Sequence, residues 1–218
     1  MAREAPPAPR PAHRPWIQLP GLLGAAECAG LLAVAEALPP AVGVIDTEAG
    51  PSARDDVRRS VVRWIDRIPA TATIFDRIGD AVAGINATHY RFALDGMPER
   101  LQFTEYAGDG KYDWHTDIDP ARPGMEPHLH AGRRLSFSVQ LSAPDDHDGG
   151  DFQIHVFGRQ YTAARQLGAA IVFPAFQYHR VTAVTRGVRR SLVGWVHGPP
   201  TEDPRFRPGD PTRLSPNW

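Results

Sequence analysis

His115 and Asp117 flank a single threonine and are suited to holding one metal ion together. In an extended segment, side chains at positions i and i+2 point to the same side, so an imidazole and a carboxylate can converge. His179 is the candidate third ligand, because it follows an apolar run and a turn and begins another extended run. The chain contains nine histidines, so a His-x-Asp triplet by itself is weak evidence for a metal site.

A second pattern strengthens the metal hypothesis. Arg189 lies ten residues after His179, across an expected turn at residues 185–187, and forms an Arg-x-Ser pair with Ser191. A guanidinium binds a carboxylate through two charge-assisted hydrogen bonds, and a hydroxyl beside it adds a third donor. Two histidines and one carboxylate leave positions open on an octahedral metal, as in non-haem Fe(II) oxygenases. The pair fits the distal carboxylate of a five-carbon keto diacid that chelates iron with its other end.

Short strands and turns must position these residues. After residue 89, short β-type runs alternate with Gly, Pro and Asp, which is typical of a sandwich or closed barrel. Along residues 135–142, apolar residues alternate with Ser and Gln, so the two kinds face opposite sides of a strand. We expect strands at residues 16–19, 61–65, 90–94, 100–106, 111–115, 134–142, 151–157, 169–173, 178–184 and 189–196.

The first part of the chain favours helices around a mixed segment. Residues 25–38 are strongly helix-forming, and residues 72–86 repeat apolar positions at helical spacing, with Thr71 or Thr73 as a possible cap. Residues 41–60 predict a loop. We divide the chain into a disordered tail at 1–15, a helical and strand support region at 16–98, a catalytic core at 99–198 and a second tail at 199–218.

Three segments resemble the Fe(II)/2-oxoglutarate-dependent dioxygenase superfamily, in its prolyl-4-hydroxylase-like branch. Residues 101–117 (LQFTEYAGDGKYDWHTD) are similar to the lead-in to the first histidine and aspartate. Residues 135–155 are similar to its strand, acidic turn, Gly-Gly and second strand. Residues 168–195 are similar to the block with the second histidine and the arginine. The resemblance covers roughly residues 99–197, and residues 57–98 more weakly.

This resemblance implies a mainly β fold, a double-stranded β-helix or cupin-like jelly roll, with supporting N-terminal α-helices. It implies Fe(II), 2-oxoglutarate and O₂ as cofactor and co-substrates, with no catalytic side chain beyond the metal ligands. By position, Tyr106 matches a tyrosine that hydrogen-bonds 2-oxoglutarate, and Trp195 an aromatic residue that lines the pocket. Gln140 matches a polar or tyrosine contact to the distal carboxylate, where a tyrosine is more usual. The implied reaction hydroxylates an unactivated C–H bond and converts 2-oxoglutarate to succinate and CO₂.

Composition limits the partners. The formal net charge is −1, so no bulk charge favours nucleic acid or an anionic membrane. No apolar run reaches the roughly 20 residues that span a bilayer, and the start of the chain has no apolar signal region. One cysteine, Cys28, fits a reducing cytoplasm. We expect a small-molecule or amino-acid substrate. A prolyl or other amino-acyl side chain of a protein and a non-catalytic cupin-like binding module are the alternatives, and the sequence does not indicate the oligomeric state.

Two further features invite interpretation. Residues 118–133 are rich in Gly and Pro and follow the first two ligands directly, so we predict a lid over the site. Arg58, Arg59 and Arg63 form a basic cluster that either contacts an acidic substrate or, as we expect, is a solvated face.

Overall fold

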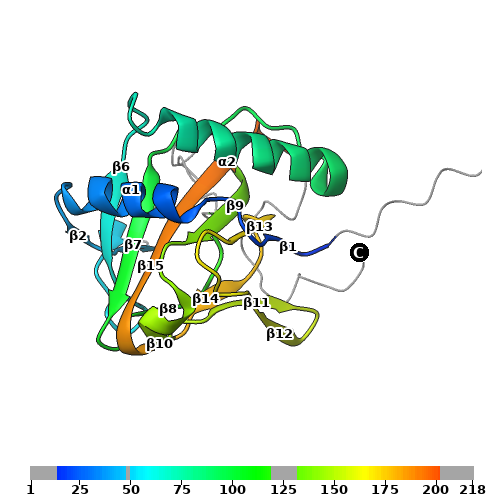
Figure 1. The fold of residues 1–218 in the computed structure, drawn as a ribbon. Helices are drawn as coiled ribbons and strands as arrows, with labels where there is room; N and C mark the ends of the chain where they lie inside the picture. Colours follow the sequence, from blue (N-terminus) through cyan, green and yellow to red (C-terminus); the bar gives the residue numbers. More distant parts are fainter. Residues whose placement is uncertain (1–13, 48–49, 119–131, 202–218) are drawn as a thin grey trace, which may run out of the picture.

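Two antiparallel sheets dominate the computed structural model, which describes residues 14–47, 50–118 and 132–201 (Figure 1). The larger sheet has the strand order β1-β13-β9-β15-β7-β6-β2, with β10 paired to β15. Its strands are β1 (Ile17–Leu19), β13 (Ala170–Pro174), β9 (Arg133–Gln140), β15 (Val184–His197), β7 (Leu101–Ala107), β6 (Val61–Ile65), β2 (Ala41–Val42) and β10 (His147–Gly149).

The smaller sheet has the order β12-β11-β14-β8-β5, and β3 and β4 form a separate hairpin. Its strands are β12 (Arg159–Thr162), β11 (Phe152–Val156), β14 (His179–Val181), β8 (Lys111–His115) and β5 (Arg58–Arg59), and the hairpin strands are β3 (Ile45–Thr47) and β4 (Gly50–Ser52). The structure is therefore mainly β, and the expected double-stranded β-helix fold is confirmed.

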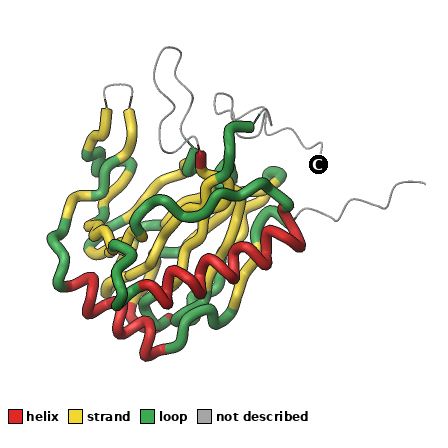
Figure 2. Tube along the Cα trace, turned by 90° about the horizontal axis from the view of Figure 1, so that it is seen from above, coloured by secondary structure: helices red, strands yellow, loops and turns green. Residues whose placement is uncertain are grey.

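Two apolar cores lie on opposite faces of the larger sheet. The first joins that sheet to helices α1 (Ala25–Glu36) and α2 (Ala72–Ile85), which lie together on one side of the strands (Figure 2). The second lies between the two sheets, where Phe173 and Val184 of the larger sheet meet Phe152 and Val181 of the smaller. Burial of these apolar faces stabilises the sandwich. A pocket lies between the two sheets, lined by residues of both.

The predicted alternation along residues 135–142 is confirmed: its apolar and polar residues face opposite sides of β9. Leu135, Phe137 and Val139 are fully buried in the helix-covered core. Ser138, on the opposite face of β9, lines the pocket between the sheets. A strand places successive side chains on opposite faces, so one eight-residue strand separates the core from the site.

The helices agree with their sequence patterns. In α2 the buried positions Ile74, Ile78, Val82 and Ile85 recur at helical spacing. Thr71 occupies the N-cap position but makes no cap hydrogen bond; its hydroxyl donates instead to the Asp66 carbonyl at 2.7 Å. Cys28 of α1 is buried in the helix-covered core.

The strand predicted at residues 90–94 is wrong. A π-helical turn, Asn86–Tyr90, continues α2, and Arg91 follows with a φ of 57°. The Asn86 side chain binds the backbone of Phe92 at both its N–H and its carbonyl, each at 2.9 Å. These backbone groups are satisfied locally, so the segment does not need a partner strand.

Two other local predictions are also wrong. Residues 41–60 contain strands β2 to β5 rather than an unbroken loop, because β2 pairs with β6 and β5 with β8. The turn expected at 185–187 lies inside β15, where Gly187 pairs with His147. Most of the predicted lid, residues 119–131, lies outside the described residues, as do residues 1–13 and 202–218. Within the described ranges, no helix is long and apolar enough to cross a membrane.

Candidate active site

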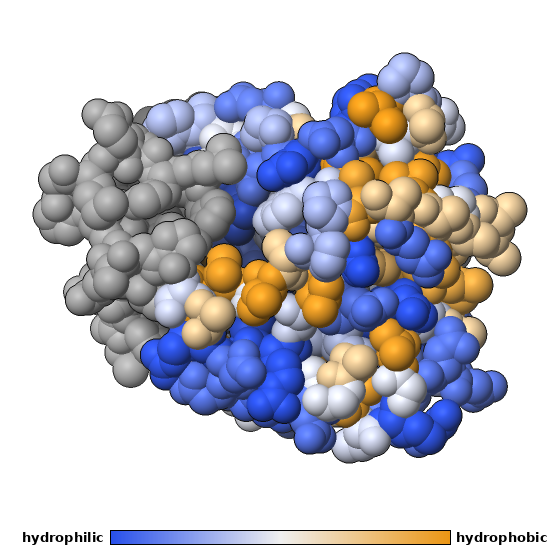
Figure 3. Space-filling model, turned by 90° about the vertical axis from the view of Figure 1, so that its left-hand side faces the viewer, coloured by the Kyte–Doolittle hydropathy of each residue, from blue (hydrophilic) through white to orange (hydrophobic). Residues whose placement is uncertain are grey.

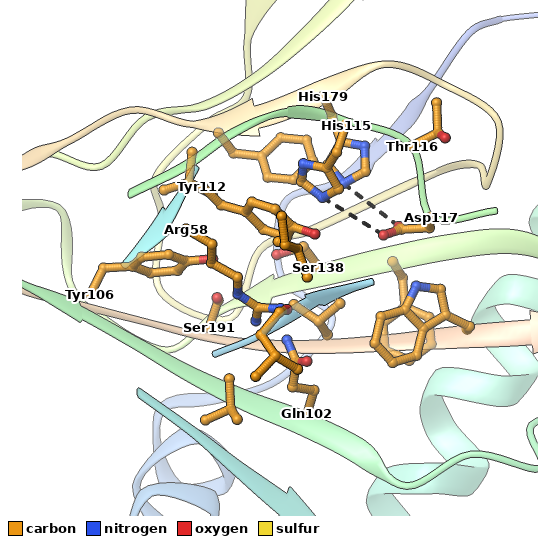
Figure 4. Close-up of a pocket in the computed structure, with 18 of the residues that line it drawn as sticks. Arg58, Gln102, Tyr106, Tyr112, His115, Thr116, Asp117, Ser138, His179 and Ser191 are labelled. Atoms are coloured by element: carbon orange, nitrogen blue, oxygen red, sulfur yellow. Dashed lines mark hydrogen bonds and ion pairs between the residues drawn. The ribbon is translucent and has the colours of Figure 1, made fainter. Parts of the chain in front are cut away.

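Three potential metal ligands meet at one end of the smaller sheet. His115 ends β8 and His179 begins β14, and the two residues are paired across these strands. The Nε2 atoms of His115 and His179 lie 3.8 Å and 3.6 Å from the Asp117 carboxylate (Figure 4). The ligand atoms all lie within 4.8 Å of one another. This spacing suits one ion bound by all three side chains.

Backbone contacts aim both imidazoles. Nδ1 of His115 lies 2.7 Å from the Asp113 carbonyl, and Nδ1 of His179 lies 2.9 Å from the Gln177 carbonyl. A carbonyl only accepts hydrogen bonds, so each Nδ1 carries the proton and each Nε2 presents a lone pair toward Asp117. Such contacts fix the tautomer of a metal-binding histidine.

The electrostatic setting favours a cation. Burial, together with the neighbouring His179, holds the pKa of His115 well below its usual value, so this imidazole is neutral near pH 7. Burial by itself raises the pKa of Asp117, but His179, His115 and Arg133 outweigh it and lower that pKa to about 2. Oδ2 of Asp117 is buried and has no hydrogen-bond donor among the described residues. An ionised carboxylate whose Oδ2 has no hydrogen-bond donor among the described residues, set between two imidazole lone pairs, fits a divalent metal.

A buried ion network holds the main chain of Asp117. Its N–H donates to the Ala175 carbonyl at 2.9 Å, and its carbonyl accepts from Nη1 of Arg133 at 3.1 Å. Glu99 accepts from Arg133 and from Nε2 of His197. No local motif in the sequence indicates this network, because its members lie on segments far apart in the chain.

Arg189 lies in the same pocket, which has a volume of about 680 Å³. It is only 1% exposed, and its Nη1 donates to the Ser191 hydroxyl at 3.2 Å. Its Nε and Nη2 have no partner among the described residues. Burial lowers the pKa of Arg189 to about 10, and the guanidinium remains charged near pH 7. A buried cation with two free donors is suited to a carboxylate.

Gly150 makes room for this arginine. A Cβ on Gly150 would approach Cδ of Arg189 to 2.9 Å, and its φ of +65° disfavours other residues. The Gly149-Gly150 pair therefore does more than shape a turn.

The other predicted cofactor-binding residues are placed differently. Tyr106 lines the pocket, pairs with Arg189 across the sheet and has its ring centre 5.5 Å from the Arg189 Cζ. Trp195 also lines the pocket, beneath the Arg133 guanidinium at 3.6 Å. Gln140 is buried on the same face of β9 as Ser138 but does not line the pocket, so its role remains a prediction.

The prediction of a solvated basic face is wrong for Arg58. This side chain is 6% exposed and lines the pocket, whereas the Arg59 side chain is 49% exposed. The sequence contains no signal that separates the two neighbours, because only the pairing of β5 with β8 decides which one points inward.

Comparison with known proteins adds an independent observation. The family model described as the 2OG-Fe(II) oxygenase superfamily matches residues 101–197, which include all three potential metal ligands and Arg189. Over residues 101–197 the chain matches the 2OG-Fe(II) oxygenase superfamily. A PKHD-type hydroxylase of Synechococcus sp. (strain JA-2-3B'a(2-13)) is 37% identical to this chain over 91 residues, which cover 42% of this chain and 39% of the relative.

Further matches extend the chain's likeness in sequence and fold. A PKHD-type hydroxylase of Teredinibacter turnerae is 29% identical over 134 residues, or 60% of this chain and 58% of the relative. The crystal structure of a Pseudomonas putida prolyl-4-hydroxylase shares the fold with a TM-score of 0.63 and 23% identity, covering 85% of this chain and 94% of that one. A prolyl hydroxylase from Trichoplax adhaerens, solved in complex with a hypoxia inducible factor peptide, also shares the fold. Its TM-score is 0.68 and its sequence identity 14%, and the match covers 88% of this chain and 86% of that one. These two curated relatives are matched over only 39% and 58% of their own length.

Proposed function

We propose that this protein is an oxygenase that hydroxylates an unactivated C–H bond of its substrate, using Fe(II), O₂ and 2-oxoglutarate. One oxygen atom of O₂ enters the substrate as a hydroxyl group, and the other enters succinate as 2-oxoglutarate loses CO₂. The observation that carries this proposal is one pocket lined by a converging His-Asp-His cluster and a buried Arg189 with free donors.

The residues present fit the cofactor and co-substrate. His115, Asp117 and His179 would hold the iron, and Arg189 with Ser191 would bind the distal carboxylate of 2-oxoglutarate. When bound, iron and 2-oxoglutarate together supply the oxidising power for the C–H bond. The side chains and backbone of the protein orient these groups and shield them from water. Backbone carbonyls orient the imidazoles, and Ser191 positions the Arg189 guanidinium. The buried Tyr106 and Trp195 exclude water.

We infer that the substrate is a free amino acid or small metabolite. A prolyl or other amino-acyl side chain in a protein is the alternative, and the names of the PKHD-type and prolyl-4-hydroxylase relatives favour a proline ring in either setting. The single pocket described above adjoins apolar side chains of β2 and its neighbours, which suits a small, partly apolar substrate.

Succinate release tests the reaction class. The full chain, supplied with Fe(II), ascorbate and 2-oxoglutarate, should release succinate slowly by itself and faster with a true substrate. Mass spectrometry of amino acids, metabolites and prolyl peptides should then reveal a product 16 Da heavier. A chain that binds metal but never forms succinate supports a non-catalytic cupin-like module instead.

A further inference from the structure

A second buried guanidinium shares the pocket with Arg189. Arg58 is 6% exposed and lines the pocket, and Figure 4 shows it among Tyr106, Tyr112 and Ser191. Its Nε donates to the Ser60 hydroxyl and its Nη1 to the Val44 carbonyl, each at 3.0 Å. Its Nη2 is buried and has no hydrogen-bond partner among the described residues. One donor group of a fixed cation therefore remains unsatisfied, which is costly unless a ligand binds it.

The surroundings of Arg58 are built to hold it in place. Arg58 pairs with Tyr112 across strands β5 and β8, and its Cζ lies 4.5 Å from the Tyr112 ring centre. The same ring stacks on His115, with centroids 3.5 Å apart, so one aromatic side chain connects Arg58 to the metal site. A Cβ on Gly43 would meet the Ser60 hydroxyl at 2.2 Å and Nε of Arg58 at 2.7 Å. Glycine at this position therefore allows the guanidinium to lie where it does.

Charge balance indicates what this cation binds. The charged side chains that line the described pocket are Arg58, Asp117, Arg133 and Arg189. Glu99 neutralises Arg133, and no carboxylate of the described residues forms an ion pair with Arg58 or Arg189. A divalent metal and the two arginines, set against Asp117 and a doubly charged 2-oxoglutarate, leave one positive charge. Buried charges are normally paired, so the pocket has room for one further anionic group.

We propose that Arg58 binds a carboxylate of the primary substrate, which makes the substrate class a carboxylic acid. This inference rests on the proposed function, because the charge balance assumes metal and 2-oxoglutarate in the same pocket. The pocket that holds Arg58 also has apolar lining residues, with Val42, Val57 and Val62 among them. Figure 3 shows the side of the molecule that carries β2, where hydrophobic patches lie between hydrophilic residues. A compact apolar group that bears one carboxylate matches this combination.

A pair of matched ligands tests the carboxylate. The full chain is loaded with Mn(II) in place of Fe(II) and saturated with 2-oxoglutarate, so that no turnover occurs. N-acetyl-L-proline and N-acetyl-L-prolinamide, which differ only in the carboxylate, are titrated by ligand-observed NMR. The acid should bind about tenfold or more tightly than the amide, as expected for a charge-assisted hydrogen bond.

Variants assign that preference to Arg58. Arg58→Gln should remove the difference between acid and amide, and Arg58→Lys should retain part of it. Gly43→Ala, which keeps the charge but displaces the guanidinium, should also reduce the preference. Arg59→Gln is the matched control, because that neighbouring side chain is half exposed and bound to Asp55. Equal binding of acid and amide, a preference that survives Arg58→Gln, or no saturable binding of any carboxylate probe overturns the proposal.

Two further probes identify the source of the carboxylate. L-proline offers a free α-carboxylate, and acetyl-Glu-Pro-Gly-amide offers only a side-chain carboxylate within a peptide. Tighter binding of L-proline identifies a free amino acid as the substrate class, and tighter binding of the peptide identifies a peptide. In either case the proposal requires that Arg58→Gln weakens this binding. The binding of 2-oxoglutarate to wild-type chain is measured separately. If 2-oxoglutarate does not bind while acid and amide still differ, the proposed function is wrong and the carboxylate site stands.

Discussion

Arg133 donates a hydrogen bond from Nη1 to the main-chain carbonyl of Asp117, 3.1 Å away. Nε and Nη2 of this guanidinium donate to Glu99, and its face lies against Trp195. One buried side chain thus connects a potential metal ligand to a pocket wall. Residues that orient metal ligands typically change metal affinity by 10–100-fold when they are replaced.

Arg133→Lys should therefore weaken metal binding by about tenfold or more. Lysine keeps the charge but cannot bind Glu99 through two nitrogens and reach the Asp117 carbonyl as well. Titration with Mn(II), followed by electron paramagnetic resonance, measures the affinity. Arg186→Lys is the control, because Arg186 lies on β15 in an exposed ion pair with Asp148. Equal Mn(II) affinity in wild type and Arg133→Lys would contradict a positioning role.

Glu99 should make the fold sensitive to acid. Burial by itself raises the pKa of Glu99, but hydrogen bonds from Arg133 and His197 outweigh it and lower that pKa from 4.5 to about 2. The ionised carboxylate therefore stabilises the folded state above about pH 4.5, and this contribution is lost as pH falls toward 2. It amounts to about 3 kcal/mol. Urea denaturation between pH 7 and pH 3 should show a lower and less pH-dependent stability for Glu99→Gln, and parallel curves would exclude this role.

Arg189→Ala should raise the KM for 2-oxoglutarate far more than it changes metal affinity. Loss of one partner of a buried charge-assisted pair costs about 2–5 kcal/mol, which corresponds to roughly 30-fold or more. Initial rates of succinate release at varied 2-oxoglutarate measure this KM, and Mn(II) titration of the same variant is the control. An unchanged KM means that another residue binds the distal carboxylate.

His179→Ala should abolish iron-dependent succinate release while the chain still folds. One of three ligands is lost, and the remaining His115 and Asp117 hold a metal weakly. Circular dichroism and thermal denaturation check the fold, and Mn(II) titration checks the loss of affinity. Full activity in this variant would show that the assigned triad is wrong. His155→Ala is the matched control, because His155 lies exposed on β11.

The sequence by itself indicated the chemistry. The spacing of His115 and Asp117, the order of Arg189 and Ser191 after His179, and the alternation along residues 135–142 depend on local periodicity. A strand places residues i and i+2 on one side whatever surrounds it, so these relationships can be read without a fold. The helix at 72–85 and the strands at 61–65 and 111–115 could be predicted for the same reason.

The tertiary structure decided which polar side chains are buried and which of them contact one another. Arg58 and Arg59 are neighbours of the same type, and only the pairing of β5 with β8 turns Arg58 into the pocket. Glu99, Arg133 and His197 meet across nearly a hundred residues of sequence. The local pattern predicted a strand at 90–94, but there the side chain of Asn86 binds the backbone carbonyl of Phe92 in place of a partner strand. Such contacts form between segments distant along the chain, and their free energy depends on burial, which local sequence does not specify.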